Sequence, residues 1–162
     1  MNLLNKLLAA TVAASALAVP AVARVEAGTP SLIEAAIEHG IKFEYNTSRC
    51  NSGRFHGSYA GRTRTITLCY QLADADAHDT VRHEVWHAIQ HCAAEKKGTP
   101  FEPIASLTDL NQFVRTQLTD EHIGRIKANY PKDHWFTELE AFAAAEAYTA
   151  TQMAQLLRGW CS

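Results

Sequence analysis

The sequence predicts a single α+β domain with a small antiparallel sheet. A chain of 162 residues has the usual length of one domain. Helical periodicity of the apolar residues recurs in one segment near residue 30 and in several segments after residue 74. Between them lie the strand-like segments, which are grouped together and do not alternate with helices. Strands and helices that are segregated in this way are typical of α+β domains.

Residues 1–23 have the composition of a signal peptide. The only charged side chain among them is Lys6, and an apolar run rich in leucine and alanine follows over residues 7–19. Residues 21–23 (A-V-A) then supply the small-x-small pattern that a signal peptidase reads. The apolar run is shorter than the roughly 20 residues that a membrane-spanning helix needs. We therefore expect cleavage at this point and a secreted or periplasmic domain over residues 24–162.

The exported domain carries little net charge and keeps all four cysteines. The whole chain has a net charge of −2, which becomes −3 when the one positive charge of Lys6 is removed. No block of basic residues is present, so we predict neither nucleic-acid binding nor membrane binding after cleavage. An even number of cysteines in an exported chain predicts disulfides. The cysteines are Cys50, Cys69, Cys92 and Cys161.

The first helix of the domain is predicted between residues 29 and 40. Thr29 or Ser31 can cap its N-terminus, and Gly40 can end it. The apolar residues within it recur at helical spacing: Leu32, Ile33, Ala36 and Ile37. The next segment, K-F-E-Y-N at residues 42–46, alternates in polarity and predicts a strand.

Residues 57–69 (G-S-Y-A-G-R-T-R-T-I-T-L-C) also predict strand structure, because they are rich in threonine and β-branched residues. A hairpin that turns near residues 59–60 would bring Cys69 roughly opposite Cys50, where a disulfide is sterically possible. This pairing would leave Cys92 for Cys161. Four cysteines allow three connectivities, however, and the sequence alone does not choose among them.

The rest of the chain predicts helices. Acidic residues begin a long helix that runs to about Lys96, and residues 98–100 (G-T-P) end it. Acids at the start and lysines at the end suit the helix dipole. Residues 106–128 predict one or two shorter helices, and residues 129–131 (N-Y-P) separate them from a last helix over residues 134–158. The acidic residues that begin the long helix are Asp74, Asp76 and Asp79.

The stretch V-R-H-E-V-W-H-A-I-Q-H-C at residues 81–92 contains an H-E-x-x-H motif. On a helix, His83 and His87 lie one turn apart on the same face, where both imidazoles can bind one zinc ion. The side chain of Glu84 is not a ligand in this arrangement. It would reach a water at the open coordination position and act as general base.

The third ligand has to come from elsewhere in the chain. His91 lies about 12 Å along the helix axis from His83, too far to bind the same ion. The metzincin pattern H-E-x-x-H-x-x-G-x-x-H fails as well, because Gln90 replaces its glycine and Ala93 replaces its histidine. The remaining option is a carboxylate from a second helix, and residues 138–141 (E-L-E-A) offer two.

The H-E-x-x-H motif followed by E-x-x-A on a second, Ala-rich helix resembles the gluzincin class of zinc metallopeptidases, and in particular its small bacterial forms. The resemblance implies a minimal zincin-like domain that binds Zn²⁺ through His83, His87 and Glu138. Glu140 is the alternative ligand, but it would point to a different face of the helix from Glu138. The carboxylate that does not bind the metal can orient an imidazole from outside the coordination sphere.

The resemblance also implies an activity. The enzyme would hydrolyse peptide bonds in peptide or protein substrates, with water activated by Glu84. Tyr130 and His134 lie between the two metal-binding segments and are candidates to stabilise the oxyanion. In the resembled enzymes a strand such as residues 63–68 borders the cleft and pairs with an extended substrate. The same residues suit the core of the sheet equally well.

Two other functions stay open. One is a non-enzymatic secreted module in which zinc is structural or vestigial, and the other is a hydrolase of cell-wall peptides.

The last helix also leaves the disulfide connectivity open, because a straight helix would place Cys161 about 34 Å from Glu138. A disulfide between Cys161 and Cys92 therefore requires that this helix breaks, or else the cysteines pair differently.

Overall fold

The structure is a computed structural model that describes residues 21–52, 56–69 and 75–162. Residues 1–20 of the predicted signal peptide and Asp74 of the predicted acidic helix start lie outside these ranges. Among the helices that are described, none is both long and apolar enough to cross a membrane.

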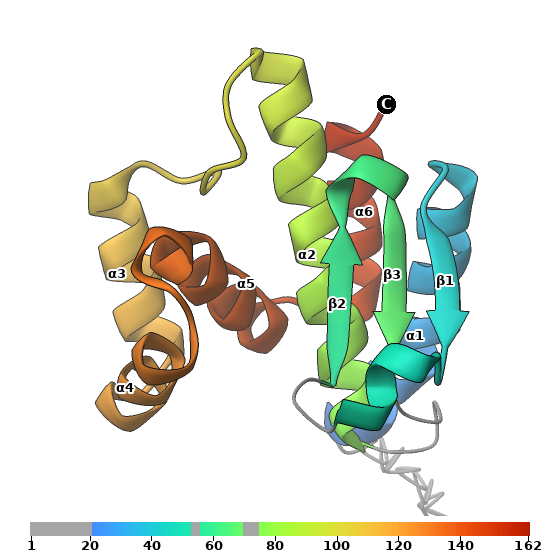
Figure 1. The fold of residues 1–162 in the computed structure, drawn as a ribbon, viewed down its shortest axis with the longest axis horizontal. Helices are drawn as coiled ribbons and strands as arrows, with labels where there is room; N and C mark the ends of the chain where they lie inside the picture. The colour runs from blue at the N-terminus through green and yellow to red at the C-terminus, as the bar shows by residue number, and fades with distance from the viewer. Residues whose placement is uncertain (1–20, 53–55, 70–74) are drawn as a thin grey trace, which may run out of the picture.

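The described chain folds into an α+β domain, as the sequence predicts (Figure 1). Three short 3₁₀ helices accompany the α-helices and strands: η1 Ser48–Ser52, η2 Gly61–Thr63 and η3 Lys132–His134. The α-helices and strands are α1 Ala21–Glu38, β1 Lys42–Tyr45, β2 Gly57–Ala60, β3 Thr65–Leu68, α2 Ala75–Lys97, α3 Leu107–Gln117, α4 Asp120–Asn129, α5 Trp135–Ala147 and α6 Ala150–Trp160.

The described chain has two hydrophobic clusters, and helix α2 contributes to the first of them. The sheet covers helices α1, α2 and α6 on one side, whereas α3, α4 and α5 lie on the other side of α2 (Figure 1). Helix α5 contributes alanines to the first cluster and Leu139 to the second, so it is packed on both sides. Large buried members of the first cluster are Leu32, Ile66, Val85, Ile89 and Met153, and those of the second are Leu110, Val114, Ile126 and Leu139.

The sheet is mixed, and the prediction of an antiparallel sheet is wrong for β1. The strand order is β1-β3-β2, with β1 parallel and β2 antiparallel to β3. Strand β3 takes the centre because all four of its residues are buried, whereas β1 and β2 are more exposed and form the edges. The hairpin between β2 and β3 turns through η2 and Arg64, which has a left-handed φ of 48°, and not at residues 59–60.

Residues 63–68 do not border a cleft as an exposed edge. Their strand, β3, pairs on both sides, with Ile66 and Leu68 packed in the core. The core alternative is therefore correct, and the expected pairing of this strand with an extended substrate is wrong. The sheet edge next to α2 belongs to β2 (Figure 1).

Helix α1 begins at Ala21, earlier than predicted, so neither Thr29 nor Ser31 caps its N-terminus. The helix packs along α6, and Gly28 permits the close approach because a Cβ there would lie 3.1 Å from Cβ of Ala150. Thr29 is buried inside the helix, 2.8 Å from the Nδ1 atom of His78 on α2. Residues 29–31 resemble a helix start in the sequence, but in the structure tertiary packing keeps them inside the helix. Gly40 follows the end of the helix with a φ of +78°.

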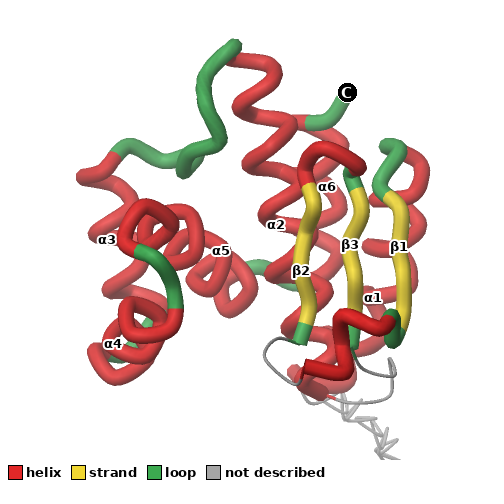
Figure 2. Tube along the Cα trace, viewed as in Figure 1, coloured by secondary structure: helices red, strands yellow, loops and turns green. Residues whose placement is uncertain are grey.

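The predicted last helix is two helices, because a short loop separates α5 from α6 (Figure 2). Thr149 caps α6 in a reciprocal capping box with Gln152, which starts the new helix in a new direction. The break allows Cys161 to bond to Cys92, while Cys50 bonds to Cys69. This connectivity is the one favoured by the hairpin argument, and two disulfides fit an oxidising environment.

Candidate metal centre

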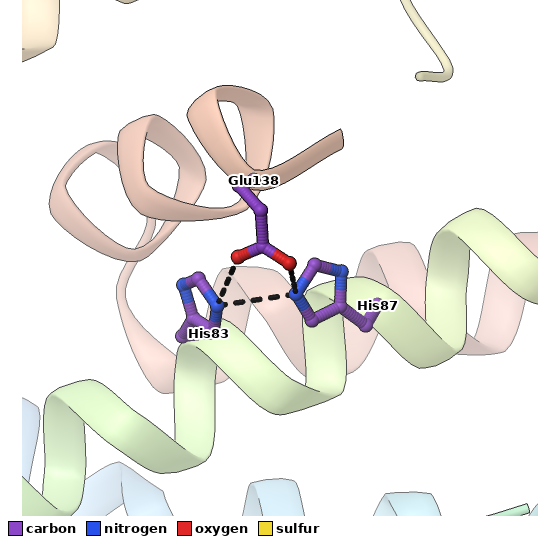
Figure 3. A group of neighbouring side chains, drawn as sticks. All are labelled: His83, His87 and Glu138. Atoms are coloured by element: carbon purple, nitrogen blue, oxygen red, sulfur yellow. Dashed lines mark hydrogen bonds and ion pairs between the residues drawn. The ribbon is translucent and has the colours of Figure 1, made fainter. Parts of the chain in front are cut away.

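The motif helix α2 and the start of α5 bring three predicted ligands together (Figure 3). The Nε2 atoms of His83 and His87 are 3.1 Å apart. The Oε2 atom of Glu138 lies 3.3 Å from Nε2 of His83, and its Oε1 atom lies 3.5 Å from Nε2 of His87. All three residues are buried. The side chains therefore converge on one point between the two helices.

A polar seam between α2 and α5 fixes this geometry. Three α2 side chains at four-residue spacing each donate a hydrogen bond to α5, in antiparallel order. Arg82 Nε donates to the Ala145 carbonyl (2.9 Å), Trp86 Nε1 to the Glu140 carboxylate (3.2 Å), and Gln90 Nε2 to the Thr137 carbonyl (3.1 Å). Residues at this spacing lie along one face of a helix, next to the face that carries the two histidines. The seam sets the rotation of α5 that presents Glu138 to the imidazoles.

The three distances fit a metal ion. Zinc bonds to nitrogen and carboxylate oxygen are about 2.0–2.2 Å long, so the ligand atoms of a tetrahedral site lie roughly 3.3 Å apart. The separations of 3.1, 3.3 and 3.5 Å lie close to that value. In the described part of the chain, the buried Oε2 atom of Glu138 has no hydrogen-bond partner. A cation at this point would compensate the burial of that oxygen.

The ionisable groups of the site perturb one another strongly. Burial alone would raise the pKa of Glu138, but the imidazoles of His83 and His87 outweigh it and lower the pKa to about 2. Burial alone would lower the pKa of His87, but the Glu138 carboxylate outweighs it and raises the pKa to about 9. Without metal, the ionised carboxylate of Glu138 therefore lies next to a protonated His87 imidazole.

The metal-free protein should gain stability from this pair most fully between about pH 4.5 and 6.5. The contribution of Glu138 is complete above its ordinary pKa of 4.5 and is lost as the pH falls through about 2. The contribution of His87 is complete below its ordinary pKa of 6.5 and is lost as the pH rises through about 9. Urea unfolding in the presence of a chelator would measure this as the difference between wild type and Glu138→Gln. A difference that does not vary with pH would contradict the assignment.

Glu84 lies beside the three ligands and is almost fully buried. Burial is the main cause that raises the pKa of its carboxyl group, and the nearby Glu138 carboxylate adds to it. The backbone of Tyr59 on β2 hydrogen-bonds to this carboxylate and acts in the opposite direction. The sheet edge therefore holds Glu84 in place, which the H-E-x-x-H motif alone does not reveal.

Gly57 on β2 provides the space for Glu84. A Cβ at this position would lie 2.5 Å from Cγ2 of Thr80 and 2.9 Å from Cγ of Glu84. We expect Gly57→Ala to push β2 away from α2 and to lower the free energy of unfolding by about 1–3 kcal/mol. Gly124→Ala is the matched control, because a Cβ there has open space and alanine favours the α4 helix. Equal unfolding free energies for the two variants would contradict this account.

Glu140 does not belong to the group that could hold a metal ion and is instead the centre of a buried hydrogen-bond network. Its carboxylate accepts from Trp86 Nε1 and Gln90 Nε2, and also from the backbone N–H groups of Ile104 (3.0 Å) and Ala105 (2.8 Å). Gln90 in turn lies 2.8 Å from the Nδ1 atom of His87. From the sequence, Glu140 is expected to orient an imidazole from outside the coordination sphere. In the structure it contacts His87 only indirectly, through Gln90.

The remaining predicted residues lie at different distances from the centre. Tyr130 is half-buried, and its pKa is raised by burial and by the carboxylates of Glu138 and Glu84, which places its hydroxyl next to the site. His134 is exposed on η3, where its Nε2 atom lies 3.8 Å from Asp133, and it does not belong to the metal-binding group. His91 faces the hydroxyl of Tyr59 through its Nδ1 atom, at 3.0 Å, and not the other histidines.

Several residues that shape the centre are not predicted by the sequence. Phe142 packs against the His83 ring with a centroid distance of 4.3 Å, and Phe101 lies 6.1 Å from the His87 ring while remaining partly exposed. The position of Phe142, four residues after Glu138 on one helix face, could have indicated the first contact. Phe101 lies in a loop, and no periodic signal places it.

Comparison with known proteins finds nothing similar to this chain. No protein-family model, no curated protein and no solved structure matches this chain. The chain is therefore described by its own geometry: a mixed α+β domain in which two histidines and a glutamate form a buried group that could hold a metal ion.

Proposed function

We propose that the protein is an exported zinc-dependent metallopeptidase of the gluzincin type. The observation that carries the proposal is the separation of 3.1–3.5 Å among the ligand atoms of His83, His87 and Glu138. Two histidines and one carboxylate form a ligand set of catalytic zinc sites, which keep a fourth position open. Glu84 stands next to this group in the H-E-x-x-H order that places a general base there.

The residues around the centre have complementary roles in peptide hydrolysis. Zinc, when bound, supplies a Lewis acid that acidifies water and polarises a carbonyl group. Glu84 accepts the proton from the attacking water and passes it to the leaving amine. Burial raises the pKa of Glu84 above its ordinary value, which favours the protonated form that it needs for the second step. Tyr130 is positioned beside both carboxylates to donate to the developing oxyanion.

Burial favours a second candidate function, a secreted module with structural zinc. Each of the three ligands exposes less than a tenth of its surface, and structural zinc sites leave no coordination position to water. The presence of Glu84 favours the catalytic proposal, since a structural site needs no base. A fourth protein ligand is the feature that would mark a structural site.

Zinc binding and hydrolysis should be tested together. We expect the protein to bind one zinc ion and to hydrolyse quenched fluorescent peptides, with activity removed by a chelator and restored by zinc. Glu138→Gln should weaken zinc binding by more than about 100-fold, since outer partners alone typically contribute 10- to 100-fold. Glu146→Gln, an exposed change on the same helix, is the control. Tight zinc binding without any hydrolysis would refute the peptidase proposal and favour the structural one.

A further inference from the structure

Gln90 occupies a position between the metal centre and the Glu140 network. Its side chain is fully buried. The Oε1 atom lies 2.8 Å from Nδ1 of His87. The Nε2 atom donates to Oε2 of Glu140 at 2.8 Å and to the carbonyl of Thr137 at 3.1 Å. Every polar atom of this amide therefore has a partner, and the partners come from two helices.

The partners of Gln90 leave only one orientation of its amide. A carboxylate and a backbone carbonyl are acceptors only, so the group that faces Glu140 and Thr137 has to be the NH₂ group. The carbonyl oxygen of the amide then faces His87, and it can only accept a hydrogen bond. The proton of a neutral His87 ring is therefore held on Nδ1, which leaves the lone pair of Nε2 directed at His83 and Glu138.

Glu140 makes this orientation difficult to reverse. Its two oxygens accept four hydrogen bonds, including those from Trp86 and from the backbone of Ile104 and Ala105. A carboxylate offers acceptor oxygens only, so it matches all four of these donors. Turning the Gln90 amide around would bring its carbonyl oxygen against the Glu140 carboxylate and an NH₂ group against His87.

The other histidine of the centre has no such support. In the part of the chain that the structure describes, the buried Nδ1 atom of His83 has no hydrogen-bond partner. The ring is held by packing against Phe142 instead. The two imidazoles are thus held by different means, and Gln90 acts on one of them alone.

We propose that Gln90 is a positioning residue that fixes His87 as a ligand through Nε2, and that Glu140 fixes the orientation of Gln90. The inference rests on the metal site proposed above. Outer partners that orient a ligating imidazole in this way typically contribute 10- to 100-fold to metal affinity. Here the partner is a neutral amide on the ligand's own helix, three residues after His87, and its orientation is set from α5.

The test combines Gln90→Met with a measurement that does not require metal. Methionine keeps about the length and volume of the side chain but lacks the amide oxygen that accepts from His87. We expect zinc affinity, measured by competition with a chelator, to fall about 10- to 100-fold. Nitrogen NMR of the metal-free wild type, at alkaline pH where the ring is neutral, should show the His87 proton on Nδ1. The Gln90→Met variant should show it distributed over both nitrogens.

The control is Gln155→Met, the same change at an exposed position of α6, which should alter neither quantity. A wild-type His87 with its proton on Nε2 would overturn the inference without any variant. Unchanged zinc affinity and an unchanged tautomer in Gln90→Met would overturn it as well. If the wild type bound no zinc, the metal proposal would fail, and the NMR result would still decide whether Gln90 sets the His87 tautomer.

Discussion

Replacing Glu84 by glutamine should lower peptide hydrolysis by about 10²–10⁴-fold while zinc stays bound. The carboxylate is the proposed base, and an amide cannot accept the proton. Glutamine keeps the volume of the side chain and an oxygen that can accept from the backbone of Tyr59, so the contact between α2 and β2 should persist. Steady-state kinetics and metal analysis of the same preparations would measure both effects.

The control for this change is Glu146→Gln, which removes an exposed carboxylate from α5. It should leave both turnover and zinc content unchanged. Hydrolysis by Glu84→Gln at the wild-type rate would refute the role of Glu84 and with it the proposed mechanism. Loss of zinc from Glu84→Gln would instead indicate that the Glu84 carboxylate takes part in metal binding.

Replacing Glu140 by glutamine should lower the free energy of unfolding of the metal-free protein by about 3–5 kcal/mol, the worth of about two hydrogen bonds to a charged acceptor. Four donors converge on a carboxylate that is 1 % exposed. An amide there would present its own N–H groups to some of these donors, and hydrogen bonds to a charged acceptor are each worth about 1.5–3 kcal/mol. Urea unfolding in the presence of a chelator would measure the loss.

Comparison with Glu138→Gln distinguishes the two carboxylates. Glu140→Gln should lose mainly stability, and zinc affinity only by the roughly 10- to 100-fold effect that acts through Gln90. Glu138→Gln should weaken zinc binding by more than that, because only Glu138 contacts both imidazoles. The reverse result, with zinc lost from Glu140→Gln and retained by Glu138→Gln, would exchange the two assignments. The backbone of residues 104–105 should also become more accessible to hydrogen exchange in the Glu140 variant, since that carboxylate binds both N–H groups.

The sequence predicted the centre better than its surroundings. The spacing of His83 and His87 follows from helix geometry alone. Glu138 followed from the E-x-x-A resemblance, and the structure brings all three side chains together. The same helical logic excluded His91, which contacts Tyr59 instead. Short-range periodicity is reliable here because both ligand segments lie in regular helices.

The features that the sequence did not predict depend on tertiary contacts. The order of three strands with four residues each is set by which strand becomes buried in the folded domain, and a run of only four residues is too short for its polarity pattern to show this. The break between α5 and α6 occurs without glycine or proline, in an Ala-rich run. Thr149 and Gln152 do form a capping signature there, but the surrounding helical pattern obscured it.

Gln90 is the clearest example of a residue whose role was hidden. The metzincin pattern identified it only as the residue that replaces a glycine. Its partners, Glu140 and Thr137, lie about fifty residues away on another helix. No local pattern connects positions that far apart, so the contact could be recognised only when α2 and α5 were seen packed together.

The disulfide between Cys92 and Cys161 has a consequence for the order in which the centre assembles. It closes a covalent loop with a sequence separation of 69, which contains Glu138 but neither histidine. Cys92 lies only five residues after His87, so in an unfolded but oxidised chain the loop keeps the carboxylate tethered near both imidazoles. Closing a loop of this length costs the unfolded chain about 4 kcal/mol of conformational freedom. A chain that forms this bond first would therefore bring the three side chains together at a lower entropic cost than a reduced one.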